Sequence, residues 1–237
     1  MLSDSRRFFK AVVGVCLIAS PLILVASALV APEIKSSEAD QLAVVAQDPG
    51  RYYLFTVLIF FSTALWVPLV LGLMYMVRDR APVLGNVGGS LAVLGTLVGV
   101  GDAISQLFIW QMVSPGADRA QMVALLTRFD NASGAALFFR IGGPALVVGM
   151  VLLSIALYRA RAVPAWAAAG AAVGTLLNIA GFVAGSTLVV LISSVVLLAS
   201  LGWMGRLVLA RPDQEWERPS AQQGSRSVPA AHNARVN

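Results

Sequence analysis

The chain has 237 residues, of which 58% are hydrophobic and only 12% are charged. A soluble domain carries about a quarter charged residues, so this composition indicates an integral membrane protein. The single cysteine, Cys16, and the single histidine, His232, exclude an intrachain disulfide, a bis-histidine haem and a Cys/His zinc site. We therefore expect no cofactor and no bound metal.

Six apolar runs are long enough to cross a hydrocarbon core, which takes about 20 residues of helix. Continuous apolarity, rather than alternation of apolar and polar residues, favours helices over a barrel. The predicted fold is an all-α, polytopic transmembrane bundle with a cytoplasmic flank over 1–9, a membrane domain over 10–209 and a disordered cytoplasmic tail over 210–237. The predicted spans cover approximately residues 10–30, 53–77, 84–110, 134–157, 164–184 and 187–208.

The first span could instead be a cleavable signal peptide. The basic stretch "SRRFFK" precedes it and "ASA" lies at 26–28, as in a signal sequence. We favour an uncleaved span, because the apolar run is longer than the usual core of a signal peptide. Cleavage would leave five spans.

Basic residues gather on one side of the predicted spans, and this asymmetry also accounts for the formal net charge of +5 without nucleic-acid binding. Lys and Arg are retained on the cytoplasmic side. Both termini are therefore expected in the cytoplasm, in a multi-pass protein of the cell (plasma or inner) membrane. The residues on that side are Arg6, Arg7, Lys10, Arg78, Arg80, Arg159, Arg161, Arg206, Arg211, Arg218, Arg226 and Arg235, against Lys35, Arg51, Arg119 and Arg128 on the other.

Two external loops are long enough to contain helices. Residues 36–50 suggest a short helix with a serine cap that ends at "DPG". Residues 114–133 place Met122, Leu125, Leu126 and Phe129 on one helical face. This second helix could lie on the outer leaflet, cover the bundle as a lid or pack as a simple connector, and we favour the connector.

Small residues at a spacing of four predict close helix contacts. The pairs are Gly85 with Gly89, Gly95 with Gly99, and Gly170 with Gly174. At "QDPGRYY" and at "LFFRIGG…YRARAVPAW" the chain resembles a family of uncharacterised bacterial multi-span membrane proteins. The resemblance implies a six-helix membrane fold over most of residues 8–208 and carries no activity.

Two ionisable residues, Asp102 and Arg140, fall inside predicted spans. A charge at the centre of a span costs at least about 2.5 kcal/mol and is a functional hypothesis by default. From the helix rise, both residues are expected in the outer half of the bundle, roughly 13 Å and 10 Å deep. We expect them to face each other as an ion pair, which could bind a ligand or simply join two helices.

The remaining candidate residues are expected in the same outer layer. Together with Pro21, Pro68 and Pro144, which would interrupt nearby helices, they could line an outward-facing polar pocket. The ligand- or ion-binding candidates are Asp102, Arg140, Gln106, Asn178, Ser62, Thr63, Ser193 and Ser194.

Three functions fit this prediction. The first is transport or binding of a small molecule or lipid, with Arg140 on an anionic group and Asp102 balancing or exchanging a proton. The second is an accessory or structural subunit for a protein partner or a homo-oligomer. The third, an enzyme acting on a lipid-like substrate, ranks last because no acid/base pair, Ser-His-Asp or metal constellation is evident.

Overall fold

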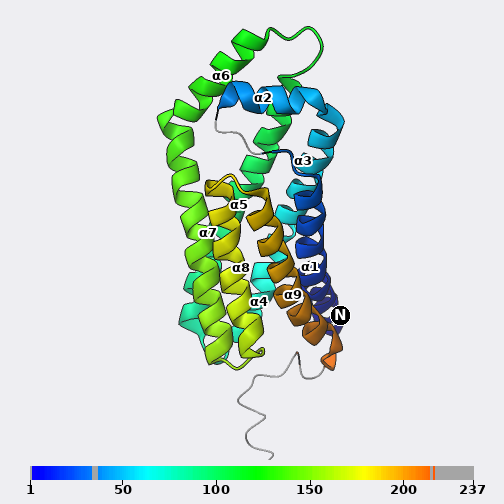
Figure 1. Ribbon diagram of the computed structural model, residues 1–237. Helices are drawn as coiled ribbons and strands as arrows, with labels where there is room; N and C mark the ends of the chain where they lie inside the picture. The colour runs from blue at the N-terminus through cyan, green and yellow to red at the C-terminus, as the bar shows by residue number, and fades with distance from the viewer. Residues whose placement is uncertain (1, 34–36, 214–215, 217–237) are drawn as a thin grey trace, which may run out of the picture.

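The computed structural model describes residues 2–33, 37–213 and 216, and all the regular structure in these residues is helical (Figure 1). Six helices or helix pairs are long and apolar enough to cross a membrane, as the sequence predicts. Two short helices connect spans at one end. The bounds are α1 Leu2–Val30, α2 Glu38–Gln47, α3 Pro49–Ala64, α4 Trp66–Val77, α5 Pro82–Gln111, α6 Arg119–Asn131, α7 Ser133–Arg159, α8 Ala165–Val183 and α9 Thr187–Ala210.

The long helices run alongside one another, with α2 and α6 across the end that lies away from the N-terminus (Figure 1). We call this end the distal end and the other the proximal end. Around the bundle, each of α1, α3, α5, α7, α8 and α9 contacts the next, and α9 returns to α1. These six helices therefore form a closed ring.

The second predicted span is broken into α3 and α4 at Leu65. Pro68 explains the break, because a proline has no amide hydrogen to give to the carbonyl four residues earlier and its ring crowds that turn. The break changes the surroundings of the chain: six of the twelve residues of α4 are buried, against three of the sixteen in α3. By contrast, α1 and α7 continue through Pro21 and Pro144 as single helices.

The main hydrophobic core lies in the proximal half of the bundle. There α4 packs against α1, α5 and α7. Its residues Trp66, Leu69, Val70 and Leu73 are each no more than 6% exposed. The distal half has no such helix inside the ring, because α3 lies on the perimeter.

Glycines bring the ring helices into backbone contact. Between α5 and α7, a Cβ on Gly95 would lie 2.6 Å from the carbonyl oxygen of Gly142, and one on Gly149 would lie 2.6 Å from that of Gly88. Such short distances leave no room for a side chain. The predicted glycine pairs were expected to bring helix backbones together. Gly85 and Gly89 instead contact side chains of α4, and Gly99 approaches only the side chain of Thr63.

The two loop helices form as predicted. Ser37 caps α2, accepting a hydrogen bond from the backbone nitrogen of Asp40 at 3.1 Å. Asp48 caps α3 in the same way, accepting from the nitrogen of Arg51 at 3.0 Å, so that "DPG" begins the next helix as well as ending α2. Asp118 caps α6.

The first residues of the predicted tail pack against the proximal end. Lys10, only 8% exposed, donates hydrogen bonds to the backbone oxygen of Arg211 and, at 2.9 Å, to Asp213. Trp216 is 5% exposed, with its ring centre 4.9 Å from that of Tyr75. The tail is therefore attached to the bundle at these positions, whereas the expectation of disorder at 214–215 and 217–237 concerns residues outside the described part.

Candidate functional site

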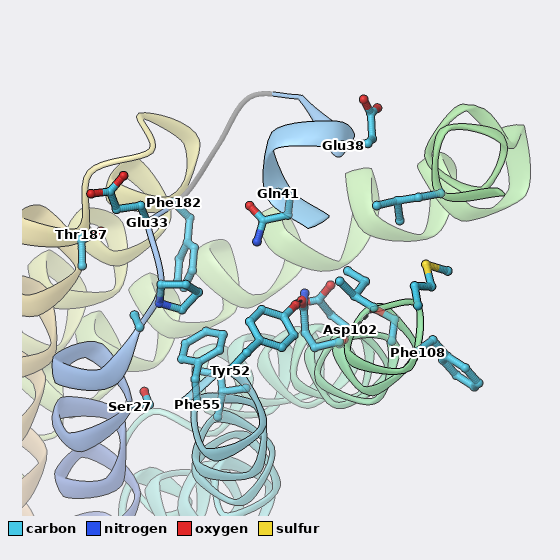
Figure 2. A pocket seen from close by; sticks show the side chains of 18 of the residues that line it. Ser27, Glu33, Glu38, Gln41, Tyr52, Phe55, Asp102, Phe108, Phe182 and Thr187 are labelled. Carbon is cyan, nitrogen blue, oxygen red and sulfur yellow. Dashed lines mark hydrogen bonds between the residues drawn. The ribbon is translucent and has the colours of Figure 1, made fainter. Parts of the chain in front are cut away.

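A cavity of about 600 Å³ occupies the distal half of the ring. The distal parts of α1, α3, α5, α8 and α9 contribute to its wall, and α2 and α6 cover it (Figures 1 and 2). The cavity follows from the break in the second span, since α3 keeps to the perimeter here and none of the described helices fills the interior.

Most of the wall is apolar. Its aromatic residues are Tyr52, Phe55, Phe108, Phe129 and Phe182. The other apolar residues are Leu24, Ala28, Ala31, Pro32, Ile59, Ile109, Met112, Leu125, Leu126 and Val190, and the other polar residues are Ser27, Glu33, Ser37, Glu38, Gln41, Asp102, Ser105, Gln106 and Thr187. Three residues of the predicted apolar face of α6, Leu125, Leu126 and Phe129, thus face the cavity. The helix borders the cavity and packs against α2 and α7, and the choice between a lid and a simple connector stays a prediction.

Three polar residues of α3 and α5 lie together in the wall. The hydroxyl of Tyr52 donates to the side-chain oxygen of Gln106. Asp102 lies one turn from Gln106 on the same face of α5. Tyr52 is 1% exposed, so its hydroxyl has a fixed position. Figure 2 shows Tyr52 extending from α3 toward Asp102, with Gln41 of α2 on the other side.

The expected ion pair between Asp102 and Arg140 is not formed. Among the described residues, no ion pair or hydrogen bond joins these two side chains, and the described wall of the cavity does not include Arg140. Arg140 is exposed on α7. The prediction that Asp102 and Arg140 form the centre of the pocket is therefore wrong for Arg140. Asp102 and Gln106 do line a cavity.

The rotation of α7 explains why the pair fails. Gly142 and Gly149, seven residues apart, face α5. Arg140 precedes Gly142 by two residues, which turns it about 200° around the helix, away from α5. Helix rise places both charges at a similar depth, but depth does not determine which way a side chain points.

The other predicted site residues make hydrogen bonds between or within helices and do not line the described wall of the cavity. Ser62 and Ser20 each donate to the other's backbone oxygen at 3.0 Å, which links α3 to α1. Asn178 donates to Ser193 at 3.0 Å and links α8 to α9. The hydroxyls of Thr63 and Ser194 bond to the backbone oxygens four residues earlier, those of Ile59 and Val190. Within the described wall of the cavity none of these predicted residues appears.

Sequence reasoning missed the aromatic part of the site. Tyr52 and Phe55, whose ring centres are 6.1 Å apart, come from the first turns of α3. They follow the "DPG" cap directly, so the start of this helix was recognised, but its apolar composition gave no sign of which face would be inside. Among the described residues no three His, Cys, Asp or Glu side chains gather in a way that could hold a metal ion.

Comparisons with protein-family models, with curated proteins and with solved structures find no match to this chain. The resemblance to a bacterial membrane family stays a prediction, and the cavity is the basis for a functional proposal.

Proposed function

We propose that this protein is a multi-pass membrane protein that binds, and as part of a transport cycle carries, a small amphipathic molecule in the distal cavity. The observation that supports the proposal is the composition of the wall: a mostly apolar, partly open cavity of about 600 Å³ with polar residues at a minority of its positions, among them Tyr52, Gln106 and Asp102. Ligand sites are typically cavities of about 300–1,000 Å³ with this combination of apolar walls and a few placed polar groups.

An anionic ligand, which the sequence suggests, does not fit this cavity. That suggestion relies on Arg140, which the described wall does not include. The ligand class consistent with the wall is therefore one with a large apolar part and a polar group directed to α5. The accessory-subunit alternative gains no specific support from the cavity.

Membrane insertion of the six helices is part of the same proposal. Large apolar side chains on the outside of the bundle, such as Phe61, Leu94 and Leu188, are 54%, 57% and 66% exposed, which would be unfavourable in water and is favourable against lipid. The basic residues concentrate at the proximal end, so this end is proposed to be cytoplasmic and the cavity to face outward.

Two single-cysteine variants test the orientation. In a Cys16→Ser background, Ala117→Cys places a thiol in the exposed distal loop and Val83→Cys places one at the proximal start of α5. An impermeant maleimide added to intact cells should label only Ala117→Cys. Labelling of Val83→Cys alone would reverse the orientation.

The binding test fills the cavity from inside. Ser105 lines it, and its neighbour Ile104, 42% exposed, is absent from the described wall. Native mass spectrometry of gently solubilised wild-type protein should show a bound small molecule or lipid. The Ser105→Trp variant should lose it, and Ile104→Trp should keep it. Wild-type protein that is always empty, or equal retention in both variants, would reject the cavity as a binding site.

A further inference from the structure

The charges on the cavity wall differ from those of an anion site. The three charged residues in the described wall, Glu33, Glu38 and Asp102, are all acidic. The nearby Arg51 is used elsewhere: its guanidinium donates to the backbone oxygens of Val30 and Ala31, at 2.9 Å and 3.0 Å, and so caps the end of α1. The described wall itself therefore presents negative charge and no basic side chain.

Asp102 is the most informative of the three acids. Glu33 follows α1 and lies beside Thr187, and Glu38 begins α2, whereas Asp102 lies on α5, in a helix proposed to cross the membrane, and its side chain is exposed at the cavity wall (Figure 2). A carboxylate in such surroundings is costly unless a positive charge or several donors compensate it. The side-chain oxygen of Gln106, one turn away, already accepts from Tyr52, so only the amide nitrogen of Gln106 is left to donate to a carboxylate. A positive charge on the ligand would complete the compensation.

The aromatic residues of the wall are independent support for a cation. Phe55 of α3, which is partly exposed, and Phe182 of α8, which is 42% exposed, present ring surface from different sides of the cavity, whereas Tyr52 beside Phe55 is 1% exposed (Figure 2). Aromatic faces attract cations, above all organic ammonium groups whose charge is spread over apolar substituents. A carboxylate beside aromatic rings in an apolar enclosure is a combination that selects for charge and for bulk at the same time.

From these observations we infer that the ligand is a lipophilic organic cation, an ammonium or similar group on an apolar body, whose positive charge lies between Asp102 and the ring of Phe55. This inference rests on the proposed function, because it names the ligand of the same cavity. The cation could be a free molecule or the choline-type headgroup of a lipid, and both share the recognised chemistry.

Two probe ions of nearly the same shape and opposite charge test the inference. Tetraphenylphosphonium and tetraphenylborate are titrated against the purified full-length protein in a neutral detergent, with protein-free micelles as the blank. Wild-type protein should bind the phosphonium saturably and the borate at least about tenfold more weakly. Equal affinity for both ions would overturn the choice of a cation.

Variants then locate the charge. Asp102→Asn should weaken phosphonium binding about tenfold or more, and Phe55→Leu should weaken it a few-fold by removing one aromatic face. Phe61→Leu is the matched control, since Phe61 lies on the same helix, is 54% exposed and is not in the described wall. If Asp102→Asn binds the phosphonium as tightly as the wild type does, the inference is wrong. Should Asp102→Asn fail to fold, wild-type phosphonium affinity in Phe55→Leu would contradict the inference instead.

Competition distinguishes the two sources of the cation. Displacement of the phosphonium by soluble dihexanoylphosphatidylcholine, but not by dihexanoylphosphatidylglycerol, supports a lipid headgroup, and displacement by neither supports a free organic cation. Displacement by the anionic lipid alone contradicts the inference.

Failure of the inference can be told apart from failure of the proposed function. If the wild type binds both probe ions with equal affinity, and Ser105→Trp abolishes both while Ile104→Trp does not, the cavity binds ligands but has no preference for cations. If neither ion binds to any variant, and native mass spectrometry finds the wild type empty, the cavity is not a binding site.

Discussion

The hydroxyl of Tyr52 on α3 donates a hydrogen bond to the side-chain oxygen of Gln106 on α5, across the wall of the distal cavity. This bond joins two neighbouring helices of the ring and at the same time fixes the amide group that lies one turn from Asp102. The same residues thus contribute to the stability of the distal half and to the shape of the proposed site.

Tyr52→Phe removes this bond and leaves the ring in place. The side-chain oxygen of Gln106 then loses its donor in a poorly hydrated site, so the free energy of unfolding should fall by about 1 kcal/mol. Ligand affinity should fall as well, because the Gln106 amide is free to turn. The change is measured by thermal unfolding in detergent. Tyr53→Phe is the control: Tyr53 is 45% exposed and contacts Trp110 through its ring, which that variant keeps, so an equal loss there would contradict the prediction.

Gly149→Ala should separate α7 from α5. The new Cβ would meet the backbone nitrogen of Ala92 and lie 2.6 Å from the carbonyl oxygen of Gly88. Neither backbone atom can move aside unless all of α5 shifts. We therefore expect the free energy of unfolding, measured by sodium dodecyl sulfate titration, to fall by about 1–3 kcal/mol. A Cβ on Gly143, in the same helix, would have no neighbouring atom within 4 Å. Gly143→Ala should be neutral or slightly stabilising, since alanine favours helix. A similar loss in both variants would show that helix contact is not the cause.

Trp216→Ala should release the start of the C-terminal tail. Trp216 is 5% exposed and packs on Tyr75, whose ring centre also lies 3.5 Å from the Arg78 guanidinium. Loss of a buried tryptophan costs about 3–5 kcal/mol in well-packed cores, and we expect the lower part of that range here. Cleavage of the tail by a glutamate-specific protease at Glu217 should become faster in this variant. Trp166→Ala, at a half-exposed position, should leave the cleavage rate unchanged.

Attachment of the tail should also depend on pH. The hydrogen bond from Lys10, together with the positive charges of Lys10 and Arg7, holds the pKa of the Asp213 carboxyl below its ordinary value. Because the pKa is lower in the folded protein than in the unfolded one, the interaction contributes stability above the ordinary aspartate pKa and loses it as the pH falls through the lowered value.

The comparison of wild type with Asp213→Asn measures this contribution. At neutral pH the wild type should have the higher melting temperature of the two, measured by thermal unfolding in detergent separately at each pH. Acid exposure should convert the wild type to the behaviour of the variant. A wild type whose advantage survives unchanged at acid pH would exclude Asp213 as the titrating group.

The elements of this fold could be predicted because each depends on local sequence. Apolar length predicted all six spans, and caps such as Ser37 predicted α2. The pairing of Asp102 with Arg140 could not be predicted in the same way, because it depends on the rotation of α7, which the glycine contact at Gly142 determines. That contact in turn depends on which helix lies opposite, and a hydropathy pattern does not contain this information.

The position of the cavity could not be predicted from the sequence either, because it also depends on contacts between distant helices. The sequence showed Pro68 in the second span and an apolar face on α6, but not that the break would place α3 on the perimeter and α4 inside. Gln106 was placed correctly next to Asp102, because residues four apart share a helical face whatever the tertiary structure is. Local geometry was therefore reliable at the site, and long-range geometry was not.

Because of the break at Leu65, the bundle has a cavity in its distal half that is closed on the proximal side by α4. Below the cavity, Trp66, Leu69 and Leu73 of α4 are buried among the surrounding helices, so a ligand that enters from the distal end meets a dead end in this conformation. Passage of a ligand to the proximal side would require α4 to move. Leu65 and Pro68 lie where α3 meets α4, so a movement of α4 relative to α3 would have its hinge there. A protein that only stores or senses its ligand would not need this movement.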